Sequence, residues 1–554
     1  MNSTSSSSAA VSRLTSLDLA IEAQKCVLRK LCIERNAALP ISRLPNEIFS
    51  GIFLHHVRSN LRAFFLVHDA HSHEDAVPSP YMWLRLAHVC SHWRSIALAS
   101  PRLWTHVDAV LEDRTEAFIE RCRSLPLVIL PAGRCSSKAL HMLFANIHRV
   151  CMLDFSSALR TGHCQSLIGA CTSISPTATL SNLTAVKMRD VPFQYVKPFL
   201  RPHLTRLALE NVPATVRAWR VVLATLPALE QLELHLCALG SEQHGTSADP
   251  SRLQDNLVVL PRLQKLRLTG ADGGYCGHAQ LLKCLAFPST TTMRLDASDD
   301  PWTLILLPSL IKAVETVASC DMSGDRRRFR TCRMHCPIDH PGGDLVFELW
   351  PTILNVADPN APLRDDDPGK LTLSWNKCFV SRLQVIRSFL SMPFLSDIRA
   401  LMVTGLGGDG DIWPHCAVLR HVTDLAISDI HPALLIDALV PPRASPHDQQ
   451  KSVLFPELHT LTMRGVTWNE CPSSIVWPMF DHEKGEERTL RKIPLAKRLQ
   501  GMLLFRRCQS VPICKLNVPR GAHIDSSQML ELEQSGAVEA AEWNQTCGRC
   551  PLCE

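Results

Sequence analysis

The amino-acid sequence predicts an α/β solenoid that follows a small all-helical N-terminal unit. Beyond residue 140, a short apolar pattern, L-x-x-L-x-L with Val, Ile, Met or Phe as variants, recurs at irregular intervals. Between residues 40 and 108, apolar residues instead recur in steps of three and four, which is the spacing of one helical face. The intervals of the first pattern bracket a period of roughly 20–29 residues, which is typical of leucine-rich repeats. We therefore expect a helical unit followed by an irregular leucine-rich-repeat array.

Composition and charge exclude several classes of protein. The chain has 554 residues, of which 46% are apolar, and apolar content this high excludes a fully disordered chain because it can bury a core. Its 58 basic and 53 acidic residues give a net charge of +5, which is too small to indicate a nucleic-acid or anionic-membrane partner. The sequence contains no run of about 18 uncharged apolar residues, so we expect a soluble protein with no membrane partner.

Cysteine usage and the first residues indicate the compartment. The 22 cysteines have no regular spacing and are better explained as reduced, partly buried residues than as a disulfide framework. The first ten residues lack the apolar stretch of a secretory signal, although a transit peptide is an alternative because no acidic residue precedes Asp18. We expect a cytoplasmic or nuclear protein whose residues 1–15 form a disordered tail.

A single amphipathic helix is predicted over residues 16–39. Its apolar residues alternate in steps of four and three, with one polar member: Leu17, Ile21, Gln24, Leu28 and Leu31. This spacing is a heptad seam, but two or three heptads are marginal for an independent coiled coil. We therefore favour a helix packed on the following unit, with dimerisation as the alternative.

The first segment of the helical unit begins near residue 44. Pro45 stands at a plausible first helical position, and Glu47 lies in the first turn. One helical face of this segment comprises Leu44, Ile48 and Ile52, with Phe49 and Phe53 alongside.

The second segment follows a polar loop. Its apolar residues at helical spacing are Leu86, Val89, Cys90, Trp93, Ile96 and Ala97. Ser100 and Pro101 end this helix, and a further apolar cluster follows at Leu103, Trp104 and Val107. A helical unit of this size buries only a modest core, so we expect it to need a neighbour.

Two stretches of this unit, LPNEIFSGIF and LAHVCSHWRSIALASPRLWTHV, carry a family resemblance. Together they resemble an F-box, in the variant common among fungal proteins. The resemblance depends on residues that stand where this pattern requires them: Pro45, Glu47, Phe53, Val89, Cys90, Trp93, Arg94, Pro101, Leu103 and Trp104. The chain departs from the compact form of the motif through an insertion over about residues 58–81.

The resemblance implies that the F-box, at residues 40–108, binds the Skp-type adaptor of a cullin-based ubiquitin ligase. The residues expected to form the adaptor contact, or the core directly behind it, are Leu44, Pro45, Ile48, Ile52, Phe53, Val89, Cys90, Trp93, Leu103 and Trp104. The resemblance also implies that the repeats bind a target protein for ubiquitin transfer.

The apolar pattern defines a leucine-rich-repeat-like domain over residues 140–540, with a cysteine-containing tail at 541–554. Its clearest copies begin at Leu183, Leu204, Leu229, Leu263, Ile398, Val422 and Leu458, and an earlier copy has Val150, Leu153 and Phe155. The second and third apolar positions of each copy alternate on a short strand and point inward. Between residues 296 and 397 the pattern is degenerate, and its candidate strands are Leu345–Leu349 and Leu371–Leu373.

The residues between these inward positions point outward and predict the target-binding surface, because successive strands of a stacked repeat form one continuous face. The charged residues of this surface that we select as target-binding are Lys187, Arg206, Glu230, Glu233, Lys265 and Arg267, and the same surface continues at Arg399 and Asp424. Their blocks of opposite charge suit a mixed-charge protein surface. The alternative is that they are ordinary solvated strand residues.

Candidate chemistry elsewhere is weak. The G-x-G-x-x-G of Gly405, Gly407 and Gly410 lacks the helix that a dinucleotide site requires at its last glycine. Three groups could in principle hold zinc, and we expect none of them to do so: His68, His71, His73 and Glu74; Cys332, His335 and Cys336; and Cys547, Cys550 and Cys553. No hydrolase elbow, P-loop or metalloprotease motif occurs, so we expect no enzyme, no metal and no cofactor.

These observations favour a substrate-recognition subunit of a Skp-cullin-F-box ubiquitin ligase. Its expected partners are the adaptor, through it a cullin, and a target protein that the sequence does not identify. A repeat scaffold whose F-box serves a complex other than a ligase is the alternative. A nucleotide-dependent enzyme is a remote third hypothesis, because it depends on Gly405, Gly407 and Gly410 alone.

Overall fold

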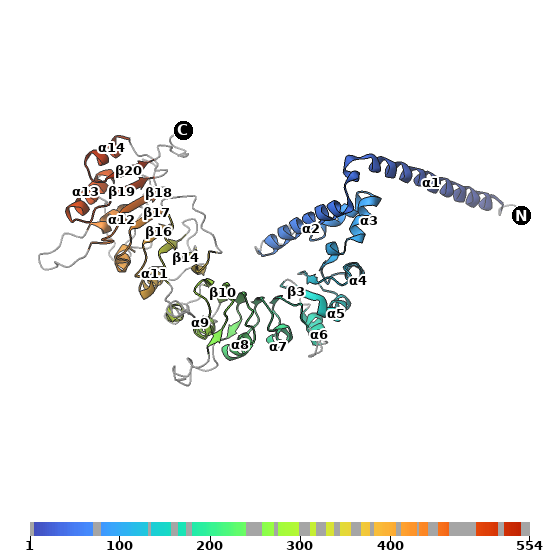
Figure 1. Cartoon of the computed structure of the whole chain (residues 1–554), viewed down its shortest axis with the longest axis horizontal. Helices are drawn as coiled ribbons and strands as arrows, with labels where there is room; N and C mark the ends of the chain where they lie inside the picture. The colour runs from blue at the N-terminus through green and yellow to red at the C-terminus, as the bar shows by residue number, and fades with distance from the viewer. Residues whose placement is uncertain are drawn as a thin grey trace. The chain divides into compact units, whose positions relative to one another are not determined.

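The computed structural model divides the chain into two compact units, Met1–Leu183 and Thr184–Glu554, and each is described by itself (Figure 1). No helix among the described residues is long and apolar enough to cross a bilayer. The described residues are 5–69, 79–130, 135–156, 164–172, 180–239, 257–270, 275–298, 311–316, 328–336, 344–355, 367–376, 382–405, 412–428, 432–440, 453–464, 495–518 and 526–543.

The first unit opens with two long helices. Helix α1 spans Ser5–Ala38, a stretch without Gly or Pro, and ends just before Pro40 in the 3-10 turn η1 (Pro40–Arg43). It therefore begins within the predicted disordered tail. Helix α2 (Asn46–Asp69) begins directly after Pro45, whose carbonyl accepts hydrogen bonds from Ile48 N and Phe49 N at 3.0 and 3.2 Å. Helix α2 thus extends into the predicted insertion, of which residues 70–78 lie outside the described part.

The second half of the helical unit is not one helix, as its spacing predicted, but two. A 3-10 helix, η3 (Met82–His88), precedes helix α3 (Ser91–Ala99). The break lies at Cys90, whose Sγ accepts a hydrogen bond from Trp93 N at 3.5 Å and so caps α3. Pro101 opens the short helix η4 (Pro101–Trp104), as expected for a residue that begins a new turn readily.

The rest of the first unit alternates strands and helices. Strands β1 (His106–Val107), β2 (Leu127–Ile129) and β3 (Val150–Phe155) pair in parallel. The connecting helices are α4 (Glu112–Arg121), α5 (Ser137–Ala145), η5 (Ile147–Arg149) and, after β3, α6 (Cys164–Thr172). This alternation starts at residue 106, before the boundary at 140 that the apolar pattern predicted.

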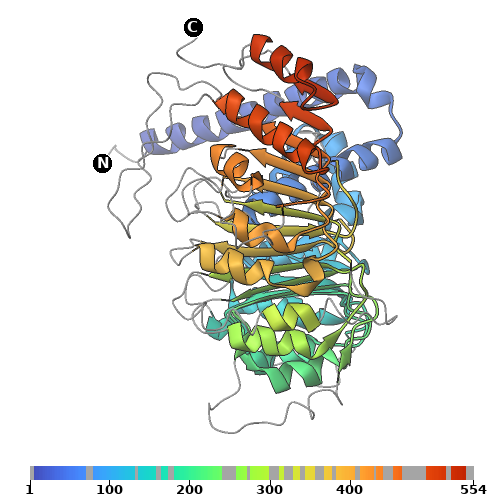
Figure 2. The same ribbon diagram turned by 90° about the vertical axis from the view of Figure 1, so that its left-hand side faces the viewer.

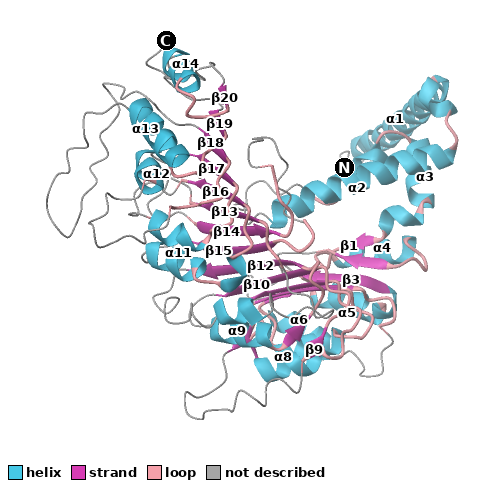
Figure 3. Cartoon of the chain, turned by 60° about the vertical axis from the view of Figure 1, so that its left-hand side comes forward, coloured by secondary structure: helices cyan, strands magenta, loops and turns pink. Residues whose placement is uncertain are grey.

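The second unit is a large, mostly parallel sheet with helices along it (Figures 2 and 3). Its main strands, in chain order, are β4 (Ala185–Arg189), β5 (Arg206–Glu210), β7 (Gln231–His235), β10 (Lys265–Gly270), β12 (Thr292–Ser298), β13 (Thr331–His335), β14 (Leu345–Trp350), β15 (Leu371–Asn376), β16 (Ala400–Thr404), β17 (Asp424–Ser428), β18 (Thr460–Arg464), β19 (Lys515–Val518) and β20 (Ala540–Trp543). Two short pairs, β6 (Ala214–Thr215) with β8 (Ala238–Leu239) and β9 (Val258–Val259) with β11 (Leu285–Ala286), are also parallel.

Helices of the second unit lie between successive strands in the chain. They are α7 (Phe193–Val196), η6 (Lys197–Phe199), α8 (Val216–Leu223), α9 (Tyr275–Lys283), α11 (Arg382–Leu390), η8 (Pro393–Leu395), η9 (Trp413–Val418), α12 (Pro432–Leu439), α13 (Leu495–Cys508) and α14 (Ser526–Gln534). Thr215 caps α8 by accepting a hydrogen bond from Ala218 N at 3.2 Å. Trp219 of the same helix donates its indole N–H to the carbonyl of Cys237 at 3.0 Å, which fixes α8 against the chain that follows β7.

The apolar pattern places its side chains as the sequence predicted. Leu207, Leu232 and Leu266 are neighbours in register on β5, β7 and β10, and all three are buried. The residue after each of β4, β5 and β7 adopts positive φ, with values of 54° at Asp190, 50° at Asn211 and 55° at Leu236. The same turn therefore follows the same inward-facing pattern in successive strands.

The strand order departs from the chain order between β12 and β16. Strand β12 pairs in parallel with β15, β14 lies antiparallel between β15 and β13, and β13 pairs in parallel with β16. The candidate strands at Leu345–Leu349 and Leu371–Leu373 coincide with β14 and β15. The expected uninterrupted succession is wrong here, because three strands enter the sheet in reverse order.

Candidate functional site

An apolar face of the first unit is exposed to solvent. On α2 and just before it, Leu44, Ile48 and Ile52 stand four residues apart and are 37%, 51% and 46% exposed. Val89, between η3 and α3, is 57% exposed, and Pro45 is exposed as well. A helix in a soluble unit ordinarily buries such a stripe, so an exposed one indicates a surface that a partner covers.

The face of α2 next to this stripe forms the core of the helical unit. Phe49 and Phe53 are fully buried, and their rings lie 5.6 and 5.3 Å from the Trp93 ring of α3, measured between centroids. A hydrogen bond of 2.9 Å between the hydroxyls of Ser50 and Ser100 joins α2 to the end of α3. The exposed stripe therefore lies on a helix whose adjoining face is fixed by aromatic packing.

A second aromatic cluster holds η4 in place. Trp104 is buried, and its indole N–H donates to the carbonyl of Ala97 at 2.9 Å. Its ring lies 5.2 Å from that of Trp83 and 4.9 Å from that of Phe118, each in an edge-to-face arrangement. The guanidinium of Arg121 covers the ring at 4.6 Å. This cluster connects η3, α3, η4 and α4.

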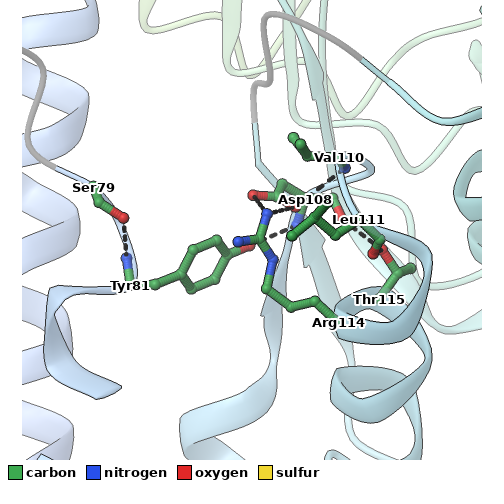
Figure 4. A network of polar contacts seen from close by, with 7 residues as sticks. All are labelled: Ser79, Tyr81, Asp108, Val110, Leu111, Arg114 and Thr115. Atoms are coloured by element: carbon green, nitrogen blue, oxygen red, sulfur yellow. Dashed lines mark hydrogen bonds and ion pairs between the residues drawn. The ribbon is translucent and has the colours of Figure 1, made fainter. Parts of the chain in front are cut away.

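A polar network around Asp108 joins the residue before η3, Tyr81, to helix α4 (Figure 4). Arg114 Nη2 contacts both carboxylate oxygens of Asp108 at 2.8 Å, and its guanidinium lies 4.6 Å from the centre of the Tyr81 ring. The Tyr81 hydroxyl accepts a hydrogen bond from Asp108 N at 2.8 Å. Thr115 Oγ1 donates to the Asp108 carbonyl at 3.0 Å. Burial raises the pKa of Tyr81, so the phenol stays protonated.

Replacing Tyr81 by Phe tests this network. The substitution removes the acceptor of a buried N–H, and an unsatisfied buried donor costs about 1–3 kcal/mol. We expect a loss of that size in the unfolding free energy of the first unit, measured by denaturant titration. Tyr195→Phe, which removes a hydroxyl from the second unit, is the matched control and should change this transition little. Equal stability of Tyr81→Phe and the wild type would show that the network contributes little.

The ten predicted adaptor-binding residues divide into three groups. Leu44, Pro45, Ile48, Ile52 and Val89 are exposed on the surface. Cys90 and Trp93 are half-buried. Phe53, Leu103 and Trp104 are buried, so of the two expected roles, contact or core directly behind it, they lie in the core behind the exposed face. Sequence reasoning also missed the network of Tyr81, Asp108 and Arg114, for which no periodic signal exists.

The predicted target-binding residues lie on the face of β4, β5, β7 and β10 that carries the polar side chains. Lys187, Glu233 and Arg267 are half-buried there, and Glu233 stands opposite Arg267 in register. Lys265 Nζ forms an ion pair with Glu233 at 3.2 Å, and Arg267 Nε forms one with the buried Asp296 at 3.0 Å.

Two further members complete this set. Arg206 is exposed at the start of β5, and Glu230 lies just before β7, where its carbonyl accepts hydrogen bonds from Gln264 N and Lys265 N at 2.7 and 3.0 Å. The structure thus brings Glu233, Lys265 and Arg267 together. It also adds Asp296 and, two residues earlier on the same strand, Arg294, whose Nε lies 2.8 Å from an Asp296 carboxylate oxygen. Sequence reasoning missed Asp296 because its contact with Arg267 depends on the register of β12 against β10.

The candidate metal and nucleotide residues are only partly within the described chain. Cys332 and Cys336 are buried on and just after β13, and burial raises the pKa of the Cys332 thiol. Within the described residues, no three His, Cys, Asp or Glu side chains are placed to hold a metal ion. The following lie outside the described side chains: His68, His71, His73, Glu74, Gly407, Gly410, Cys547, Cys550 and Cys553.

Comparison with family models identifies part of the first unit. The F-box-like family model matches residues 41–109, which include the exposed apolar face, the packed rings of Phe49, Phe53 and Trp93, the pair of Trp83 and Trp104, and Asp108. A search of curated proteins finds no match to the chain. The match identifies residues 41–109 as an F-box-like domain and supports an F-box protein.

Proposed function

We propose that the chain is a non-catalytic substrate-recognition subunit of a Skp-cullin-F-box ubiquitin ligase. The observation that carries the proposal is the exposed apolar stripe of Leu44, Ile48 and Ile52, which lies within the F-box-like match. F-box-like domains typically bind a Skp-type adaptor, and an apolar helix face above a rigid aromatic core is the kind of surface that a protein partner buries. In this proposal the protein acts in the cytoplasm or nucleus.

The second unit is proposed to capture the target as an irregular leucine-rich-repeat array. Inward leucines in register and positive φ after β4, β5 and β7 support repeated units of one kind. The face with Glu233, Lys265 and Arg267 offers mixed charges on adjacent rigid strands, which suits recognition of a folded protein surface.

Purification of the tagged full-length chain from its native cells tests the proposal. We expect both the Skp-type adaptor and a cullin to co-purify, and both to be lost from a variant with Leu44→Ala and Ile48→Ala. Recovery of the adaptor without a cullin would indicate a scaffold outside a ligase. Recovery of neither partner would contradict the proposal.

A charge exchange tests the target surface. Glu233 and Lys265 form an ion pair, so replacing Glu233 by Lys and Lys265 by Glu keeps an ion pair between the two positions. The exchange reverses the charge that a bound target protein meets at each position. We expect target capture to fall roughly tenfold, since rim and surface charges typically contribute about 1 kcal/mol. Arg267 is left unchanged, because a carboxylate there would lie beside buried Asp296.

The matched control for this exchange uses the ion pair of Asp437 on α12 and Arg498 on α13. Replacing Asp437 by Lys and Arg498 by Glu inverts a pair on the helices and should leave target capture unchanged. Equal capture by both exchanged proteins would place target recognition away from the strand face.

A further inference from the structure

Helix α1 exposes an apolar seam between Leu14 and Leu31. Every described side chain from residue 13 to 35 is exposed, so the expectation that this helix packs on the following unit is not met. The apolar members of the seam are 49–61% exposed: Leu14, Leu17, Ile21, Leu28 and Leu31. Together with Gln24 they follow an unbroken seven-residue repeat over three successive heptads.

A stripe of this period specifies a helical partner. A seven-residue repeat keeps its apolar residues facing one partner helix only if two helices wind around each other. In heptad notation Leu14, Ile21 and Leu28 occupy a positions, and Leu17, Gln24 and Leu31 occupy d positions. A lone helix with such a seam would leave about half of each of these large side chains in water.

The charges beside the seam match a second copy of the same helix running in the opposite direction. When Leu14 faces Leu31 of the second copy, Leu17 faces Leu28 and Ile21 faces Gln24. In an antiparallel pair, g positions meet g positions and e positions meet e positions. This register then places Arg13 beside Glu34 and Asp18 beside Lys25, each of them twice by symmetry. At the remaining g positions, Ala20 meets Val27.

The parallel alternative is less complementary. It would place Arg35, which continues the a positions, directly against Arg35 of the second copy. Of the flanking charges it would pair only Arg13 with Asp18, and Lys25 would face Ala20. Lys25 also forms an ion pair with Glu22 of its own helix at 2.8 Å, which both arrangements retain because Glu22 lies outside the seam.

We propose that α1 joins two copies of this chain as an antiparallel coiled coil in that register. Each assembly would then carry two F-box-like domains and two target-binding units. A target with two recognition segments would bind such an assembly more tightly than a single chain, because the second contact forms at high effective concentration. The dimer itself is independent of the ligase function, since it concerns only residues before the F-box-like domain, whereas the gain in target affinity rests on the proposed role of the second unit.

The mass of the purified full-length chain in solution, measured by light scattering and sedimentation, is the first test. We expect twice the 61.7 kDa of one chain. Leu17→Asp with Leu28→Asp, which face each other in the proposed register, should return the protein to one chain. Leu19→Asp with Ile33→Asp changes two exposed apolar residues away from the seam and should leave the dimer intact. A monomeric wild-type chain, or a dimer that survives Leu17→Asp with Leu28→Asp, overturns the proposal.

A charge-reversal cycle then tests the direction of the helices. Asp18→Lys and Lys25→Glu should each raise the dimer dissociation constant roughly three- to tenfold, as expected for the reversal of two surface ion pairs. The double variant should restore the wild-type value, because only the antiparallel register brings positions 18 and 25 together. In a parallel pair, Lys25→Glu would have little effect and the double variant would stay weak, which would overturn the register. If α1 instead bound the adaptor, the chain alone would be monomeric and the seam variants would weaken adaptor binding.

Discussion

Leu44→Ala combined with Ile48→Ala should weaken adaptor binding at least about 100-fold while leaving the fold intact. Apolar side chains at the centre of an interface commonly contribute about 2–4 kcal/mol each when truncated, and both of these are exposed in the chain by itself. Their removal opens no cavity in the core. Alanine is also a better helix former than isoleucine, so helix α2 loses no stability at Ile48. Binding is measured with purified adaptor by calorimetry, and folding by thermal denaturation.

The control for this prediction is Leu111→Ala. Leu111 is 55% exposed in the same unit but precedes helix α4, outside residues 41–109. Its truncation should affect neither adaptor binding nor stability. Pro45 is kept in these variants, because its ring fixes the backbone φ directly before α2 and its replacement would combine a helix effect with a surface effect. Wild-type affinity in the double variant would mean that the adaptor, if bound at all, contacts another face.

In the helical unit, the spacing of apolar residues predicts that α2 is a helix but does not predict which face of the helix is exposed. Leu44, Ile48 and Ile52 stand four residues apart, and so do Phe49 and Phe53. Both stripes are apolar, so periodicity alone does not reveal which of them packs inside. The structure decides it through the Trp93 ring, which lies against the two phenylalanines.

The spacing of apolar residues also could not predict polar contacts between residues that are far apart in the sequence. Tyr81 and Asp108 are separated by 27 residues, and Arg267 and Asp296 by 29. Each pair forms because a turn or a strand register brings the two side chains together. Apolar periodicity carries no information about such contacts, whereas the inward positions of β5 and β7 follow from alternation alone.

The reversed order of β13, β14 and β15 was missed because alternation has no direction. In β14, Leu345, Phe347 and Leu349 point inward whether the strand runs parallel or antiparallel to its neighbours. Only the connections determine the direction, and much of the chain that connects β12 to β15 lacks a clear pattern. Regular leucine spacing thus predicts where strands occur. It predicts their order in the sheet only where a helix connects each strand to the next, because such a connection makes the two strands parallel neighbours.

Trp104→Ala should destabilise the first unit by about 3–5 kcal/mol, the usual cost of deleting a large buried aromatic side chain. Trp104 contacts the rings of Trp83 and Phe118 and donates to the carbonyl of Ala97, so its removal opens a cavity and removes one of the two hydrogen bonds that this carbonyl accepts, the other being donated by Ser100 N. Trp104→Phe retains most of the packing and should cost less. Denaturant titration of the full-length chain, followed by circular dichroism, measures both changes.

The same variant distinguishes a supporting residue from a contact residue. Because Trp104 is only 2% exposed, adaptor binding by Trp104→Ala should fall only as the folded fraction falls. At low temperature, where most molecules are folded, its affinity should approach that of the wild type, unlike the affinity of Leu44→Ala with Ile48→Ala. A Trp104→Ala protein of normal stability that fails to bind the adaptor would contradict this assignment and place Trp104 in the contact.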